Sequence, residues 1–260
     1  MTSGPTIVGS STIESTQTKL TAGKLSQTTV QSRDTFGTPL SNTDDLYSMQ
    51  FTGPTGGAFS VAGIYLDKGL YQLQYVPRVA GNYIVHITLL GVDIKGSPYN
   101  VVVMPGETSS SNSFTTVTNL ALTQFEAGVT YLFQLQLVDI FNNYLVDGSQ
   151  NDFIEVMALY QNNAAWPSPI SIPDLANWQS IYGVDIAGLC SNNNNGVYNC
   201  QLTTYRAGLY TMSVKVNGLH VFNSPWSPVN VSPTDLYAPS CVPKGIPVTM
   251  VAGTQYTFQI

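Results

Sequence analysis

The strongest constraint on the fold of this chain is that the sequence repeats itself. A segment that begins with Ala-Gly occurs three times, at Ala22, Ala127 and Ala252. A second pair of segments also matches, GLYQLQYVPRVAGNY from Gly69 and GVYNCQLTTYRAGLY from Gly196. Repetition over this length is typical of a tandem array in which each copy is one structural unit.

The repetition divides the sequence into two full units and the start of another. We place the first unit at residues 1–104, the second at 105–232 and the start of a third, incomplete unit at 233–260. The second unit is longer because an insertion, at about 160–182, separates its two matching halves. The third unit stops within its expected second strand. Since one strand pair cannot bury a sandwich core, we expect the natural protein to continue.

Within each unit, apolar residues occur at every second position of short segments. Residues 83–89 and 210–216 show this pattern over their whole length. A β-strand places alternate side chains on opposite faces, so such a segment predicts a strand with one buried face. Clusters of Gly, Pro and Asn separate the segments, and no long stretch has a helical period. We therefore predict an all-β fold of tandem immunoglobulin-like Greek-key β-sandwiches, with about seven strands each.

The repeated residues resemble the filamin repeat. That family has a G-x-Y strand, a turn ending in A-G or P-G before a Tyr, and a final strand that opens with S-P-aromatic. The first unit has these features at Gly69, Tyr71, Gly81, Tyr83, Ser97, Pro98 and Tyr99, and the second at Gly196, Tyr198, Gly208, Tyr210, Ser224, Pro225 and Trp226. The second unit departs at Thr204, where the family has Pro, and in its insertion. The resemblance covers nearly the whole sequence and implies the fold more than the function.

The composition excludes several classes of function. Charged residues make up 9% of the sequence, and the net charge is −6, whereas a typical soluble domain has about 25% charged residues. The nine Lys and Arg residues are too dispersed to neutralise phosphates, so we predict no nucleic-acid binding. No apolar run reaches the roughly 20 residues of a membrane helix, and the N-terminus lacks a signal-peptide pattern. Hydroxyl and amide side chains replace charged ones, which suits an extracellular setting.

Catalytic and metal-binding motifs are missing from the sequence. The only histidines, His86 and His220, have no partner at a metal-ligand spacing, and we expect both to be ordinary surface residues. No nucleophile-elbow, phosphate-loop or dinucleotide motif is found. Asp34 and Asp139 recur at the same place in the two units, where a turn-forming role is more common than calcium binding. We predict a protein that is not an enzyme and has no cofactor or metal.

Two cysteines lie close together in the second unit. The resemblance implies that Cys190 and Cys200 are on neighbouring strands, D and E, where they could form a disulfide across the hairpin. Cys200 stands where the first unit has Leu73, so a role as a small core residue is the alternative. A disulfide would indicate an oxidising compartment. The partner of Cys241 is left open.

The insertion and one sequon are the other candidate sites. Trp166 and Trp178 in the insertion are candidate contacts for a neighbouring protein or a glycan. The alternative is a loop that folds back over its own sheet or over the junction between units. Asn230 begins the only N-glycosylation sequon, although Pro233 follows it and should lower its use.

These observations favour a structural or adhesive function. We expect an extracellular or cell-surface protein whose repeats form a stalk, fibre or filament, with other protein chains, further copies of itself or glycans as partners. The alternative, which the resemblance implies, is an intracellular cytoskeletal scaffold that binds partner peptides by β-strand addition beside strands C and D. The insertion falls between those strands in the second unit. A third class, a carbohydrate-binding or hydrolase accessory module, rests on the tryptophans alone.

Overall fold

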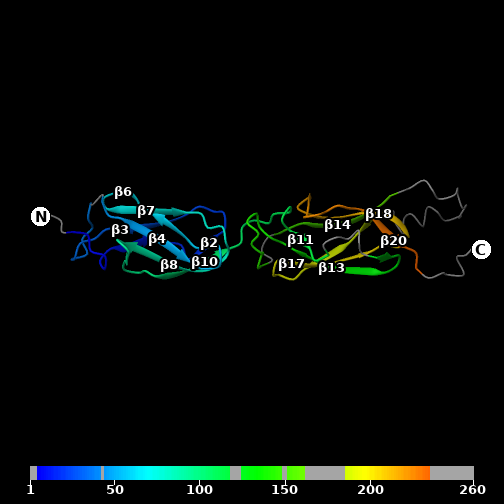
Figure 1. Ribbon diagram of the computed structural model, residues 1–260, viewed down its shortest axis with the longest axis horizontal. Helices are drawn as coiled ribbons and strands as arrows, with labels where there is room; N and C mark the ends of the chain where they lie inside the picture. The colour runs from blue at the N-terminus through cyan, green and yellow to red at the C-terminus, as the bar shows by residue number, and fades with distance from the viewer. Residues whose placement is uncertain (1–4, 42–43, 118–123, 148–150, 162–184, 235–260) are drawn as a thin grey trace, which may run out of the picture.

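The computed structural model describes residues 5–41, 44–117, 124–147, 151–161 and 185–234. These residues form strands and connections, and none of them lies in a helix. The strands make two sandwiches that follow one another along the long axis of the molecule (Figure 1). This arrangement confirms the predicted all-β fold.

The first sandwich consists of two sheets. The four-stranded sheet has the order β1 (Thr12–Ser15), β3 (Ser26–Gln31), β7 (Leu70–Tyr75) and β6 (Ile64–Asp67). The six-stranded sheet has the order β2 (Lys19–Thr21), β10 (Tyr99–Met104), β8 (Gly81–Leu89), β4 (Tyr47–Thr52) and β5 (Phe59–Ala62), and β9 (Val92–Asp93) pairs with β8. All pairs are antiparallel except β2 with β10, which is parallel.

The second sandwich repeats this topology strand for strand. Its four-stranded sheet has the order β11 (Phe114–Thr115), β13 (Thr130–Gln136), β17 (Val197–Thr203) and β16 (Leu189–Asn192). Its six-stranded sheet has the order β12 (Phe125–Glu126), β20 (Trp226–Ser232), β18 (Gly208–Val216), β14 (Ile154–Tyr160) and β15 (Asp185–Ala187), and β19 (Leu219–His220) pairs with β18.

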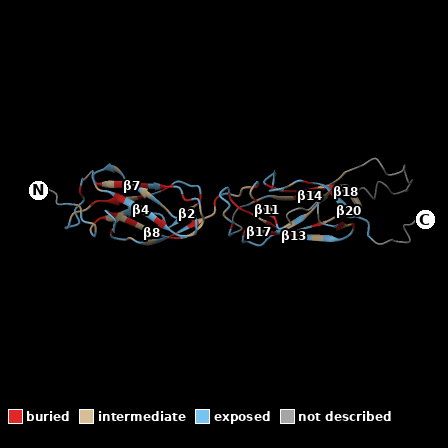
Figure 2. Ribbon diagram, in the orientation of Figure 1, coloured by how far each residue is buried: buried red, intermediate tan, exposed pale blue. Residues whose placement is uncertain are grey.

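Each core lies between its two sheets, where the period-two pattern placed it (Figure 2). Along β8 the residues Tyr83, Val85, Ile87 and Leu89 are buried, and the residues between them are exposed or half-buried. The equivalent strand β18 buries Tyr210, Met212, Val214 and Val216. Burial of one such side chain contributes about 1.5–3 kcal/mol, so the alternating strands supply most of the stabilising surface.

The G-x-Y motif requires glycine at its first position for the same steric reason in both sandwiches. Gly69 has φ of 73°, and a Cβ there would lie 1.8 Å from the carbonyl oxygen of Leu40. Gly196 has φ of 77°, and its Cβ would lie 2.1 Å from the carbonyl oxygen of Leu145. Only glycine fits a positive φ with a neighbouring segment so close.

The structure has more strands than the predicted seven per unit. The first strand of each sandwich divides in two, so that β1 joins one sheet and β2 joins the other. A further strand, β5, pairs with the outer edge of β4 before the backbone passes at Gly63 to β6 in the opposite sheet. A Cβ on Gly63 would lie 3.0 Å from the Cβ of Tyr47, so glycine leaves room for the crossing.

Two of the predicted segments fall outside the described residues. The insertion at about 160–182, with Trp166 and Trp178, lies almost wholly in residues 162–184. Nearly all of the third unit, 233–260, lies in residues 235–260. The structure does place the insertion between β14 and β15, because β14 ends at Tyr160 and β15 begins at Asp185.

Candidate functional site

The junction between the two sandwiches is held by polar and apolar contacts that belong to neither core. On the second sandwich it is formed by residues 139–143, which we call the Asp139 turn. On the first sandwich it is formed by residues 22–24 and 77–80, which we call the Gly23 end. The connecting segment around Gly106 runs between them.

Asp139 organises the turn and fixes the connecting segment to it. Its side chain is fully buried, at 0% exposure. Oδ1 accepts the backbone N–H groups of Phe141 at 2.8 Å and Asn143 at 2.9 Å. Oδ2 accepts the N–H of Gly106 at 2.7 Å and the Nδ2 of Asn143 at 2.8 Å. The predicted turn-forming role is therefore confirmed, and Asp139 also holds the linker between the repeats.

Asn143 joins the two sandwiches directly. Its Nδ2 donates to the carbonyl oxygen of Arg78 at 2.7 Å, and its Oδ1 accepts the N–H of Ala80 at 2.8 Å. One amide thus pairs with a backbone carbonyl and an N–H that lie two residues apart on the first sandwich. Asp at this position would lack the donor, so the pairing depends on the carboxamide.

Phe141 supplies the apolar part of the junction. A Cβ on Gly23 would lie 2.7 Å from the Cε2 atom of the Phe141 ring, so the ring sits where a side chain would otherwise be. Gly23 has φ of 79°, and its N–H donates to the carbonyl oxygen of Pro77 at 2.7 Å. The guanidinium of Arg78 lies 6.0 Å from the ring centroid, at the limit of a cation–π contact.

Charge contributes little to the junction. Lys24 Nζ lies 2.8 Å from Glu107 Oε1, but both side chains are exposed to solvent. The hydrogen bond from Lys24, with its positive charge, lowers the pKa of Glu107. Exposed ion pairs of this kind contribute little to stability, because water and salt screen the two charges. The contacts that set the geometry are therefore the neutral ones made by Asn143 and Phe141.

The structure brings Cys190 and Cys200 together. They are directly opposed on β16 and β17, with 4.1 Å between their Cα atoms and 1.98 Å between their sulfur atoms. We call this pair the hairpin disulfide. Cys200 is also 1% exposed and part of the core, so the two roles considered from the sequence are compatible.

The histidines lie beside the serine of the S-P-aromatic motif, a role that the sequence did not suggest. Ser97 Oγ accepts the N–H of Ile87 at 2.8 Å and donates to Asp93 Oδ1 at 2.7 Å. His86 Nδ1 lies 3.0 Å from Asp93 Oδ2. The hydrogen bond from Ser97, and then His86, lower the pKa of Asp93. This cluster ties the motif to β8.

The second sandwich has a simpler version of the same contact. Ser224 Oγ accepts the N–H of Val214 at 3.0 Å and lies 3.0 Å from His220 Nδ1. In both sandwiches the serine therefore bonds the backbone of the long central strand, which explains the motif by structure alone. The peptide bond between this serine and the following proline is cis in both.

The strand expected to accept a partner peptide is already paired on both sides. β4 pairs with β8 and β5, and β14 pairs with β18 and β15. On this side, the edge strand of the six-stranded sheet is therefore β5 in the first sandwich and β15 in the second. The resemblance implied strand addition beside strands C and D. In the first sandwich the edge of β4 itself is taken by β5, because the backbone returns along β4 before it passes to the other sheet.

Asn230 lies on β20 opposite Leu209, and its side chain is exposed. Among the residues that the structure describes, no three His, Cys, Asp or Glu side chains gather closely enough to hold a metal ion. Nor do the described segments include a helix long and apolar enough to cross a membrane.

Comparison with known proteins identifies the repeat. Residues 3–100 match the family model described as Filamin/ABP280 repeat. E3 ubiquitin-protein ligase TRIM71 of Rattus norvegicus is 34% identical over 84 residues, which are 32% of this chain but only 10% of that protein. The first sandwich is a filamin-type repeat, as the resemblance of its motifs indicated.

Solved structures extend the fold over both sandwiches. The Escherichia coli adhesin FdeC is similar over 88% of this chain and 66% of its own, with a TM-score of 0.55 and 18% identity. Invasin, a bacterial integrin-binding protein, is similar over 88% of this chain and 41% of its own, with a TM-score of 0.50 and 13% identity. At these identities the likeness is one of fold, and it covers tandem immunoglobulin-like sandwiches in both cases.

Proposed function

We propose that this protein is a non-enzymatic structural or adhesive protein, a stiff tandem array of filamin-type repeats that acts outside the cell as a stalk or fibre. The observation that carries the proposal is the junction. Asn143 pairs with the backbone of the first sandwich, Phe141 packs on Gly23, and Asp139 holds the connecting segment. Repeats fixed to each other in this way behave as a rod rather than as beads on a string.

Three features support an extracellular location. The hairpin disulfide is of a kind that persists in oxidising compartments. The low charge and the exposed Asn230 sequon suit a secreted glycoprotein. The similar fold of FdeC, an adhesin, agrees with this assignment.

The intracellular alternative, a scaffold that binds peptides, draws on the similarity of the first repeat to TRIM71. In such a scaffold a peptide would pair with β5 or β15, because β4 and β14 have no free edge. The two locations differ in one measurable respect. In protein from the natural source, alkylation and mass spectrometry should find the hairpin disulfide oxidised, and reduced thiols would favour the scaffold.

The stiffness of the array is tested by residual dipolar couplings measured separately for each sandwich. In the wild-type protein we expect the two sandwiches to report the same alignment tensor, as parts of one rigid body. The double variant Phe141→Ser, Asn143→Ala should lose the common tensor. The matched control changes the equivalent residues of the first sandwich, Phe36→Ser with Thr38→Ala, and should keep it. Different tensors in the wild-type protein would refute the rod.

A further inference from the structure

The first sandwich carries a turn of the same construction as the Asp139 turn, at its opposite end. We call residues 34–38 the Asp34 turn. Asp34 Oδ1 accepts the N–H groups of Phe36 and Thr38, both at 2.9 Å. These are the two bonds that Asp139 makes to Phe141 and Asn143. The two turns therefore place a phenylalanine at the same position.

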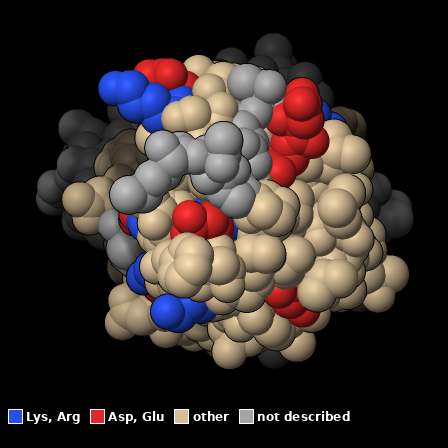
Figure 3. Space-filling model, turned by 90° about the vertical axis from the view of Figure 1, so that its left-hand side faces the viewer, with Lys and Arg blue, Asp and Glu red and all other residues tan. Residues whose placement is uncertain are grey.

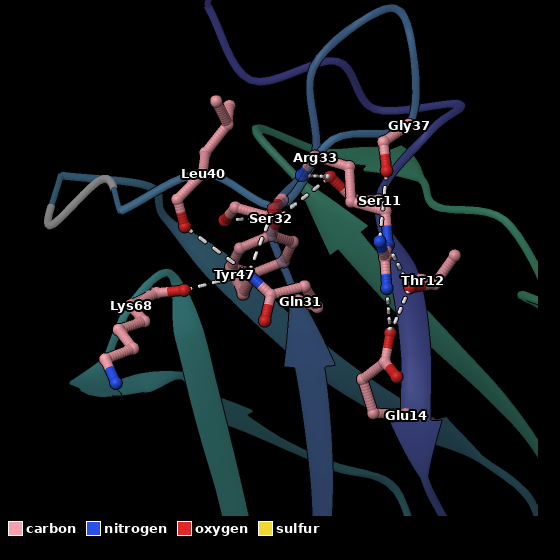
Figure 4. Close-up of polar contacts among 10 residues, drawn as sticks. All are labelled: Ser11, Thr12, Glu14, Gln31, Ser32, Arg33, Gly37, Leu40, Tyr47 and Lys68. Carbon is pink, nitrogen blue, oxygen red and sulfur yellow. Dashed lines mark hydrogen bonds and ion pairs between the residues drawn. The ribbon is translucent and has the colours of Figure 1, made fainter. Parts of the chain in front are cut away.

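The Asp34 turn is held rigidly by its own sandwich. Arg33 donates from Nη1 to the carbonyl oxygen of Gly37 at 3.0 Å, from Nη2 to Glu14 Oε1 at 2.9 Å and from Nε to Thr12 Oγ1 at 2.9 Å (Figure 4). The hydrogen bond from Thr12, and then the one from Arg33, lower the pKa of Glu14. A turn fixed in advance loses little conformational freedom when something docks on it.

The phenylalanine of this rigid turn projects into solvent. Phe36 is 89% exposed, whereas Phe141 in the equivalent turn is 36% exposed because it packs on the first sandwich. The left-hand end of the molecule in Figure 1, seen end-on in Figure 3, is mostly uncharged surface with acidic and basic groups spaced across it. A large apolar ring that projects from a fixed turn into solvent contributes little to the stability of its own repeat.

We infer that the Asp34 turn is a docking surface for another filamin-type repeat of this kind. It docks on the end of that repeat that corresponds to the Gly23 end, which we call the Gly-turn end. The inference rests on the proposed function as an array, and it extends the contact seen at Phe141 to Phe36. The partner surface has a defined chemistry, which the Gly23 end displays. It has a glycine of positive φ to receive the ring. At the Gly23 end, a backbone carbonyl and an N–H two residues apart also bond the side chain of Asn143.

The second sandwich carries an end of this type. Gly128 has φ of 83°, and its N–H donates to the carbonyl oxygen of Thr204 at 2.7 Å, as Gly23 donates to Pro77. Among the described residues, no atom lies within 4 Å of a Cβ built on Gly128. One repeat type thus has a Phe turn at one end and a Gly turn at the other. This is the head-to-tail complementarity from which open arrays are built.

The two turns differ at the position that bonds the partner backbone. Asn143 is replaced by Thr38 in the Asp34 turn. A hydroxyl is shorter than a carboxamide and cannot span the two backbone groups that Asn143 joins. Docking through the Asp34 turn should therefore depend on the phenylalanine more strongly than docking through the Asp139 turn does.

The test places the sequence of the Asp34 turn opposite a known Gly-turn end. In the full-length protein, the variant Ile140→Thr, Asn142→Gly, Asn143→Thr converts the Asp139 turn into the Asp34 sequence and keeps Phe141. A second variant adds Phe141→Ser. Residual dipolar couplings compare the alignment tensors of the two sandwiches, and amide dispersion in the second sandwich verifies that each variant folds.

We expect the converted turn to keep the common tensor and the added Phe141→Ser to abolish it. Loss of the common tensor in the first variant would overturn the inference, because the Asp34 sequence would then be unable to dock. Retention in both variants would also overturn it, because the ring would not matter. Different tensors in the unaltered protein would instead show that the array itself is not stiff.

Discussion

Replacement of Asp139 by alanine should destabilise the second sandwich far more than the equivalent replacement in the first. Asp139 is completely buried and accepts four N–H groups, one from the connecting segment and three from its own turn. Asp34 accepts two such side-chain bonds in an exposed turn. The pair gives a matched comparison, since both residues build the same turn.

The magnitude follows from which donors lose their partner. A buried donor left without an acceptor costs about 1–3 kcal/mol. The N–H of Gly106 is in a buried bond, and the N–H groups of Phe141 and Asn143 are in partly buried ones that water can replace in part. We therefore expect Asp139→Ala to lower the free energy of unfolding by about 3–4 kcal/mol, and Asp34→Ala by about 1 kcal/mol.

The tryptophans make the assay specific. All three lie between residues 105 and 232, so tryptophan fluorescence reports unfolding of the second unit. With a urea slope of about 1.5 kcal/mol/M, the midpoint should fall by about 2 M in Asp139→Ala. Asp34→Ala should leave this transition unchanged. A midpoint shift in Asp139→Ala no larger than that in Asp34→Ala would refute the assignment of Asp139 as the residue that holds the junction.

Three further outcomes are expected. Reducing the hairpin disulfide should lower the stability of the second sandwich by about 3 kcal/mol on the chain-entropy model for a separation of 10 residues, seen as an earlier urea transition with dithiothreitol. Gly69→Ala should cost more than about 3 kcal/mol in thermal unfolding followed by circular dichroism, because its Cβ would meet the Leu40 carbonyl, whereas Gly37→Ala, with similar φ and open space, should cost about 1 kcal/mol. Ser97→Ala should raise the pKa of Asp93 in an NMR titration, because the Ser97 hydrogen bond lowers that pKa in the folded protein. The stability that the ionised Asp93 contributes is present above the ordinary carboxyl pKa and is lost as the pH falls through the lowered pKa.

The sandwich fold could be predicted because its cause is local. The alternation along residues 83–89 and 210–216 states which side chains face the core, and β8 and β18 bury those side chains. These features need no knowledge of distant parts of the sequence.

The extra edge strand could not be predicted with the same means. β5 is only four residues long, too short for its alternation of half-buried and exposed positions to distinguish a strand from a loop in the sequence. Its place depends on pairing with β4 and on the crossing at Gly63, which are tertiary contacts. The backbone therefore doubles back along β4 at a place that the sequence pattern does not mark.

The junction was harder still to predict from the sequence, because identical residues in the two repeats make different contacts. Phe36 and Phe141 occupy the same position of the same turn, yet one is exposed and the other packs on a neighbouring repeat. The groups of the first sandwich that Asn143 bonds are backbone groups. Every residue type has a backbone, so the sequence does not mark these groups. The recurrence of Asp34 and Asp139 identified the turn but could not identify what lies against it.

The parallel pairing of the first and last strands has a mechanical consequence. β2 and β10 run in the same direction, as do β12 and β20. The polypeptide enters each sandwich ahead of one strand of the pair and leaves after the other, so tension along the molecule drags the two strands past each other. The backbone bonds between them, such as Ala22 N–H to Met104 O at 2.9 Å and Ala127 N–H to Ser232 O at 2.9 Å, lie across the direction of pull. These hydrogen bonds are loaded together instead of opening one at a time. The lifetime of each repeat under load is therefore set by the rate at which all the bonds between its two terminal strands shear.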